Sequence, residues 1–113
     1  MEQRTARLRV RPDPRHLTVA RSFLAATLRL QGAPEATIDD LRIALSELLT
    51  PLITEGREGI EVEISTTPPI VVSIQAGDPP PDLDEQTEEL VQRLTEGRLA
   101  ATGTGWSIEV VLD

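Results

Sequence analysis

The stretch SELLTPLITEG, residues 46–56, holds the residue types that point most directly to chemistry. Glu47 and Pro51 are four residues apart, so on a helix they face the same way, the geometry that lets two oxygen ligands share the water shell of one metal ion. Proline has no side-chain oxygen, and inside a helix it removes a hydrogen bond at a cost of roughly 3 kcal/mol. The stretch therefore offers one carboxylate for acid–base or metal chemistry, with no side-chain oxygen four residues further on.

Other candidate groups give weaker signals. His16 is the only histidine and falls in the first turn of a predicted helix, where a surface role is expected. The acidic run at 78–89 lacks the glycine and ligand spacing of a calcium loop. GTG at 103–105 lies between alternating residues, which predicts a hairpin turn and not a phosphate loop. Trp106 and Phe23 are expected in the core.

Composition restricts the function classes. A chain of 113 residues with 39% hydrophobic content predicts one domain over residues 1–113. The absence of cysteine excludes disulfides, thiolate metal sites and a cysteine nucleophile. The net charge of −8 argues against a nucleic acid partner. No apolar run is long enough to cross a membrane and no signal peptide is visible, so we expect a cytoplasmic protein.

Hydrophobic periodicity predicts the secondary structure. Alternation with period 2 predicts strands at 5–11, 60–65, 70–75, 98–102 and 106–112. A helical period predicts helices at 13–32 and 33–56, and a third helix that starts at the capping pair Asp82 and Glu85 and reaches Leu94. The order β-α-α-β-β-α-β-β predicts an α/β (α+β) two-layer sandwich, with three helices covering one face of a mixed, mainly antiparallel sheet of about five strands.

Residues 11–56 resemble the opening of the histidine-kinase-like (GHKL) ATPase domain of RsbW-type anti-sigma factor serine kinases, and the order of elements extends the resemblance over essentially the whole chain. In that family the second helix ends in S-E-x-x-T-N-A, where the glutamate activates water and the asparagine holds magnesium. Ser46, Glu47 and Thr50 stand in the motif, and Pro51 replaces the asparagine. The resemblance thus implies that the magnesium site has lost its amide ligand.

The family's second motif, D-x-G-x-G, recognises adenine. Here Ala76 falls on the aspartate, while Asp78 and Pro80 fall on the glycines. A shift by two residues would make Asp78 the aspartate, but the prolines at 79–81 would still stiffen the backbone. The lid and the glycine-rich phosphate turn of the family are missing, because the chain passes from Asp84 directly into an acidic helix start. The resemblance therefore implies a degenerate domain with its ATP lid deleted, binding neither ATP nor metal.

This pattern predicts a non-catalytic, protein-binding regulator in which Glu47 is vestigial. The partners implied by the resemblance are a sigma factor, an anti-sigma antagonist or a second copy of the chain, with no nucleic acid and no membrane. Two alternatives stay open. One is an active ATP-dependent anti-sigma serine kinase with divergent motifs, and the other is a structural accessory subunit.

Charge placement suggests where a protein partner would bind. Residues 1–15 hold five arginines against two carboxylates, a net +3, which leaves −11 for the remainder of a chain whose total is −8. Arg7, Arg9 and Arg11 share one face of the first predicted strand. They form either a protein-docking edge or cross-strand pairs with Glu61 and Glu63.

Overall fold

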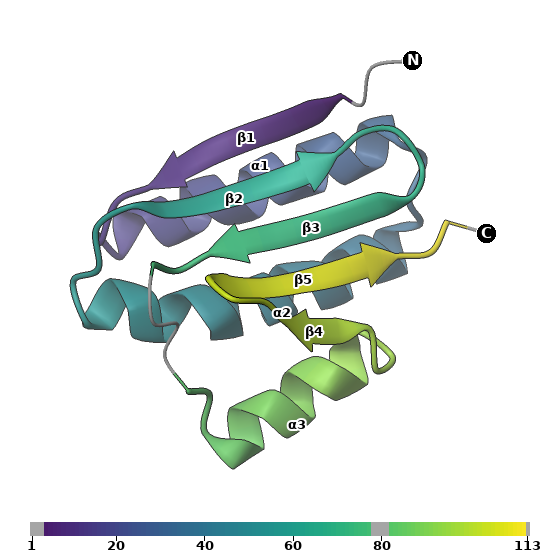
Figure 1. The fold of residues 1–113 in the computed structure, drawn as a ribbon. Helices are drawn as coiled ribbons and strands as arrows, with labels where there is room; N and C mark the ends of the chain where they lie inside the picture. Colours follow the sequence, from purple (N-terminus) through teal and green to yellow (C-terminus); the bar gives the residue numbers. More distant parts are fainter. Residues whose placement is uncertain (1–3, 78–81, 113) are drawn as a thin grey trace.

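The computed structural model describes residues 4–77 and 82–112, which form a five-stranded sheet with helices against one face (Figure 1). The predicted element order is confirmed. The elements along the chain are β1 (Thr5–Val10), α1 (Arg15–Leu30), α2 (Glu35–Thr54), β2 (Ile60–Ser65), β3 (Ile70–Gln75), α3 (Glu85–Leu94), β4 (Leu99–Ala101) and β5 (Gly105–Val110).

The strands lie in the order β1-β2-β3-β5-β4, and every neighbouring pair is antiparallel. The sheet is thus antiparallel where the sequence had left room for a mixed one. The last hairpin turns through residues 102–104, closed by a 2.9 Å hydrogen bond from the Thr102 N–H to the Gly105 carbonyl. The prediction that GTG is a turn is therefore confirmed, although both strands of the hairpin are shorter than predicted.

The core lies between the sheet and the helix pair α1–α2, which Figure 1 shows behind the sheet. α2 contributes most to it, because eight of its twenty residues are buried. The buried face of α2 includes apolar residues that recur at the helical period: Ile38, Leu41, Leu45, Leu48 and Leu52. Burial of each such side chain stabilises the fold by about 1.5–3 kcal/mol. None of the helices in the described residues combines the length and the apolarity needed to cross a bilayer.

Local hydrogen bonds explain where the helices begin and end. The N-cap residue of α1 is Pro14, and the Asp13 carboxylate before it accepts from the main-chain N–H of Arg15, the first residue of the helix, at 2.9 Å. After α1, Gly32 has φ +84°, and the next N–H, that of Ala33, donates to the Leu28 carbonyl at 3.0 Å. Only glycine adopts this left-handed conformation without strain, so the glycine sets the end of the helix.

The predicted cap of α3 was wrong. Asp84, and not Asp82, is the cap, since α3 begins at Glu85 and the Asp84 backbone is extended (φ −67°, ψ 156°). The Asp84 carboxylate accepts from the Thr87 N–H at 2.9 Å and from the Thr87 hydroxyl at 3.0 Å. These hydrogen bonds lower the pKa of Asp84 from its usual value. A threonine three residues after the cap was the signal that the sequence analysis missed.

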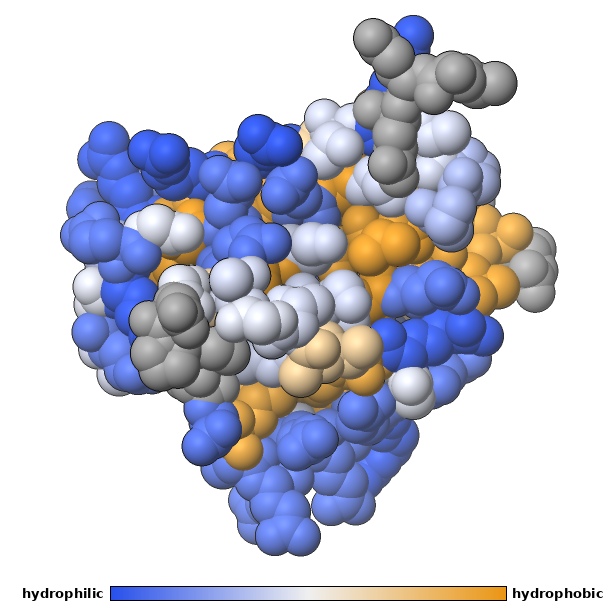
Figure 2. Space-filling model, viewed as in Figure 1, coloured by the Kyte–Doolittle hydropathy of each residue, from blue (hydrophilic) through white to orange (hydrophobic). Residues whose placement is uncertain are grey.

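No helix or strand of residues 4–77 and 82–112 covers the opposite face of the sheet. Figure 2 shows hydrophilic side chains over β1 and β2, and paler, less polar residues over the middle of the sheet. A cross-sheet row of register partners on this face runs from a charged pair to small residues: Arg7, Glu63, Ser73, Ser107 and Ala100. Charge is therefore concentrated toward the β1 side of the open face.

Candidate functional site

The hydroxyl groups of the S-E-x-x-T stretch are used inside α2. The Ser46 hydroxyl donates to the Arg42 carbonyl at 2.9 Å, and the Thr50 hydroxyl donates to the Ser46 carbonyl at 2.6 Å. Such bonds to the carbonyl four residues back are common for serine and threonine in helices and slightly bend them. Both hydroxyls therefore serve the helix itself.

Glu47 and Pro51 lie on the same side of α2 as the sequence predicted, and both are half-buried. Within the described residues, the Glu47 carboxylate makes no hydrogen bond or ion pair. Pro51 lies inside the helix and cannot donate to the Glu47 carbonyl, but its own carbonyl accepts from the Glu55 N–H at 3.0 Å. The proline is tolerated because α2 ends at Thr54, so the lost bond lies in the last turns.

Ala76, directly after β3, is fully buried, with 0% of its surface exposed. Its N–H donates to the Thr104 carbonyl at 2.7 Å. Its carbonyl accepts from the Arg57 Nη1 at 2.9 Å. Both main-chain polar groups of Ala76 are thus engaged within the chain, and its methyl group packs in the core. Asp78, the other residue considered at this position, lies outside the described residues.

Gly105 and Trp106 close the same end of the sheet from β5. Gly105 lies opposite Gln75, and a Cβ atom added to it would be only 1.8 Å from the Ile74 carbonyl oxygen. Trp106 lies opposite Ile74 and is 5% exposed, which confirms the prediction of a core position. The end of β3 is therefore packed against the start of β5 without space for another group between them.

A model of the histidine kinase-like ATPase domain matches residues 10–109, nearly the whole chain and every element described above except most of β1 and the end of β5. The chain belongs to the histidine kinase-like ATPase domain family. No curated protein sequence matches it. The histidine-kinase part of the resemblance is thereby confirmed.

In this histidine kinase-like domain, the two positions that the resemblance assigns to nucleotide and metal binding carry no polar side-chain atom. According to the resemblance, Pro51 falls at the asparagine position and Ala76 at the aspartate position. Within residues 4–77 and 82–112, no cluster of three or more histidine, aspartate or glutamate side chains is placed to hold a metal ion. Neither Pro51 nor Ala76 therefore offers a side-chain oxygen or nitrogen to a nucleotide or Mg²⁺, and Glu47 is the motif carboxylate that lies within the described residues.

A hollow of about 330 Å³ lies between α3 and the β4–β5 hairpin. Asp82, Glu88, Gln92 and Trp106 are among the residues that line it, while Glu47, Pro51 and Ala76 are not. The carboxylates of Asp82 and Glu88 would repel phosphate groups. At the nearby start of α3, the Thr87 N–H already donates a hydrogen bond to the Asp84 carboxylate. The hollow therefore differs in both position and charge from the site that the resemblance describes.

The three arginines predicted to act together differ in their surroundings. Arg7 is paired with both acidic neighbours, Nε to Glu61 at 3.4 Å and Nη2 to Glu63 at 3.0 Å. Arg9 and Arg11 are exposed, and their side chains make no ion pair with any described residue. Cross-strand pairing is thus confirmed for Arg7 alone.

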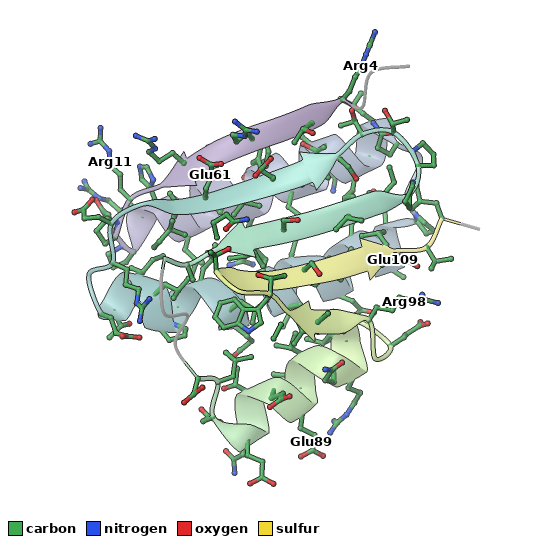
Figure 3. The ribbon with its side chains drawn as sticks, in the orientation of Figure 1. Arg4, Arg11, Glu61, Glu89, Arg98 and Glu109 are labelled. Atoms are coloured by element: carbon green, nitrogen blue, oxygen red, sulfur yellow. The ribbon has the colours of Figure 1, made fainter. Side chains whose placement is uncertain are left out.

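Arg4 and His16 lie next to these arginines, at opposite ends of β1. Figure 3 shows Arg4 and Arg11 at the two ends of β1, extending away from the sheet. The His16 ring accepts a hydrogen bond from the Arg11 main-chain N–H at 3.0 Å through Nδ1, which gives the histidine a structural partner at the start of α1. We call Arg4, Arg9 and Arg11, together with the outer side of β1, the arginine edge.

Arg57 was missed by the sequence analysis. It lies between α2 and β2, and it reaches the end of β3 by bonding to the Ala76 carbonyl, while its Nε lies 3.6 Å from the Glu55 carboxylate. An arginine shortly after a helix end has no distinctive spacing. Its role becomes visible only when the fold brings the end of β3 next to it.

Proposed function

We propose that this histidine kinase-like domain is a degenerate relative of the RsbW-type anti-sigma factors, acting in the cytoplasm as a protein-binding regulator without catalysis. The observation that carries the proposal is Ala76. Where the resemblance requires an aspartate facing adenine, the chain has a fully buried methyl group whose N–H and carbonyl are bonded to Thr104 and Arg57. Binding of adenine there would break at least one of these bonds and open the core.

Two further features support the same reading. Pro51 removes the amide ligand for magnesium, and the Ser46 and Thr50 hydroxyls are already bonded to carbonyls of α2. The first turn of α3 carries Glu85 and Glu88, which favour the helix macrodipole but oppose a triphosphate. Adenine, metal and phosphate contacts are therefore each compromised by a different element.

Isothermal calorimetry with Mg-ATP tests this proposal. We expect no saturable heat up to millimolar ligand at physiological salt. A dissociation constant below a millimolar would contradict the proposal and favour an active serine kinase. Emission from Trp106, the only tryptophan, gives an independent readout in the same titration, since it lies beside the end of β3 and is 5% exposed.

We assign partner binding to the arginine edge, with a sigma factor, an anti-sigma antagonist or a second copy as the candidate partners. Support comes from charge. The edge is basic on a chain whose net charge is −8, and such a polarised field steers an acidic partner to one side of the molecule.

Substitution separates this role from a structural one. The double variant Arg9→Gln/Arg11→Gln should weaken partner binding in a salt-sensitive way and leave the melting temperature nearly unchanged, because neither side chain has an ion pair among the described residues. Arg98→Gln is the matched control, since it removes the pair with Glu109 at the other side of the sheet and should leave partner binding unchanged. Unchanged partner binding in the double variant would show that the arginine edge does not bind the partner.

A further inference from the structure

The outer edge of β1 carries main-chain groups that point away from the sheet. β1 is the terminal strand, and the Thr66 N–H donates to the Arg4 carbonyl at 2.8 Å. In an antiparallel pair, residues alternate between positions that bond the neighbour and positions that point outward. With this register, Ala6, Leu8 and Val10 bond to β2, and Thr5, Arg7 and Arg9 direct their N–H and C=O groups outward.

Nothing in the described part of the chain takes up these outward groups. No residue of 4–77 or 82–112 forms a hydrogen bond with the main chain of Thr5, Arg7 or Arg9 from outside the sheet. A row of unpaired N–H and C=O groups is a template for an additional strand, which is why edges are often protected by charged side chains.

The side chains of β1 define the chemistry of such a strand. Arg7 and Arg9 are exposed on the open face of the sheet, while Leu8 between them is half-buried on the helix side and packs against the core. Directly opposite side chains on two strands contact each other, and opposite charges stabilise the pair. A strand added here therefore needs acidic residues opposite Arg7 and Arg9 and an apolar residue opposite Leu8.

β2 already has this pattern on the other side of β1. Its sequence is IEVEIS, with Glu63 opposite Arg7, Glu61 opposite Arg9 and Val62 opposite Leu8. Val62 is fully buried, and both glutamates are only half-buried beside the arginine. The inner edge of β1 thus pairs with a strand in which acidic and apolar residues alternate.

A second copy of β1 is a poor occupant of the outer edge. Antiparallel pairing of two β1 strands centred on Arg7 places Arg7 opposite Arg7, and pairing centred on Leu8 places Arg7 opposite Arg9. Like charges directly opposite each other destabilise a sheet. The arginines therefore select against self-pairing and in favour of an acidic strand.

We propose that β1 binds an extended acidic segment of a partner protein by strand addition, in which acidic residues alternate with apolar ones. This inference rests on the proposed function, because it describes how a protein-binding regulator would hold its partner. The main-chain groups of Thr5, Arg7 and Arg9 supply the hydrogen bonds, and the guanidinium groups of Arg7 and Arg9 select the sequence.

The test uses a capped peptide that copies residues 60–65 (IEVEIS) between short Gly-Ser ends, titrated into the full chain and followed by amide hydrogen exchange. We expect the Arg7 and Arg9 amides to exchange more slowly when the peptide is bound, since both are open in the free chain. A peptide with both glutamates replaced by glutamine should bind about two- to five-fold more weakly. Raising the salt concentration should reduce this difference.

Two variants of Arg9 separate the contribution of its side chain to peptide binding from that of its main-chain N–H. Arg9→Gln removes only the charge and should weaken binding about two- to five-fold. Arg9→Pro also removes an outward N–H that β2 does not use, so the fold should persist while binding falls at least a further ten-fold. Arg98→Gln, at the far side of the sheet where Arg98 pairs with Glu109 (Figure 3), is the control and should leave binding unchanged. The circular dichroism spectrum of each variant checks folding.

Several results would overturn the proposal. The first is the absence of saturable binding at millimolar peptide, and the second is equal peptide binding by Arg9→Pro and Arg9→Gln. The third is self-association of the free chain that Arg9→Pro abolishes, because a second copy of the chain would then be the molecule that binds the edge of β1. Calorimetry with Mg-ATP on the same samples keeps the two proposals apart. If the chain binds neither the peptide nor ATP, only the proposal of strand addition is contradicted. If the chain binds ATP, the proposed function is contradicted.

Discussion

Ala76 and Thr104 are joined by a main-chain hydrogen bond of 2.7 Å, one step beyond the last register pair of β3 and β5, Gln75 and Gly105. This bond holds the tip of the last hairpin against the end of β3. Because Arg57 bonds to the Ala76 carbonyl from the other side, the α2–β2 connection, β3 and the hairpin meet at one residue. The stability of this junction should therefore depend on how closely β3 and β5 approach.

The first prediction concerns Gly105. Gly105→Ala should destabilise the fold by about 3 kcal/mol, because the new methyl group would sit 1.8 Å from the Ile74 carbonyl oxygen and 3.2 Å from the Ala76 nitrogen, and the two strands would have to separate. Gly103→Ala is the matched control in the same hairpin, with no atom within 4 Å of the added Cβ, and should change stability by less than about 0.5 kcal/mol. Urea unfolding measures both. Equal stability of the two variants would contradict the close approach.

The second prediction concerns Pro51. Pro51→Asn should stabilise the fold by about 1–2 kcal/mol, because it restores a donor to the Glu47 carbonyl, and the greater freedom of the unfolded chain offsets part of the gain. Unfolding in urea measures the change.

The same variant should show no ATP turnover in a phosphate-release assay, since Ala76 remains buried. Measurable turnover would mean that the nucleotide site needs only the asparagine.

The third prediction separates the two candidate caps of α3. Asp84→Ala should lower the melting temperature, because it leaves the Thr87 N–H and hydroxyl without their acceptor. Asp82→Ala, two residues earlier and outside the helix, should be close to neutral. Thermal unfolding of both variants decides the point, and a larger loss from Asp82→Ala would restore the original assignment.

The fourth prediction is a pH dependence at the start of α1. Hydrogen bonds from the Arg15 side chain, and then from its main-chain N–H, lower the pKa of Asp13 from 3.8 to about 2. The unfolded chain then binds this proton at a higher pH than the folded chain does, so the stabilisation is present above about pH 4 and is lost as the pH falls toward 2.

Asp13→Asn tests this dependence. Its free energy of unfolding should be lower than that of the unmodified chain at pH 6, and the difference should shrink steadily between pH 4 and pH 2. A difference that stays constant over this range would show that the carboxylate charge of Asp13 plays no part.

Much of the fold was predictable because burial imposes a period on each element. The inner face of α2 and the alternation in β2 and β3 were read correctly, since each of these elements buries one face against the same core. The cap of α3 was less predictable. Asp82 and Asp84 both precede an acidic helix, and only the contact with Thr87 distinguishes them.

The candidate site was predictable in its residue types and not in its contacts. The resemblance suggested Pro51 and Ala76 as replacements, because they fall at the asparagine and aspartate positions of its two motifs, and this assignment stays a prediction. The sequence did not predict that Arg57 binds the Ala76 carbonyl, nor that Arg7 takes both glutamates and leaves Arg9 without one. Such contacts depend on how side chains from distant segments share limited space, and no local pattern encodes that choice.

The pairing of β1 with β2 also has a consequence for synthesis on the ribosome. Val10 pairs with Ile60 and Thr5 with Ser65, and both helices of the pair α1–α2 lie between them in the chain. A nascent chain therefore exposes β1 with two open edges until β2 has left the exit tunnel, although the helices, which need only local contacts, are able to form earlier. During that interval, the arginines of β1 disfavour its pairing with the β1 strand of a neighbouring nascent chain.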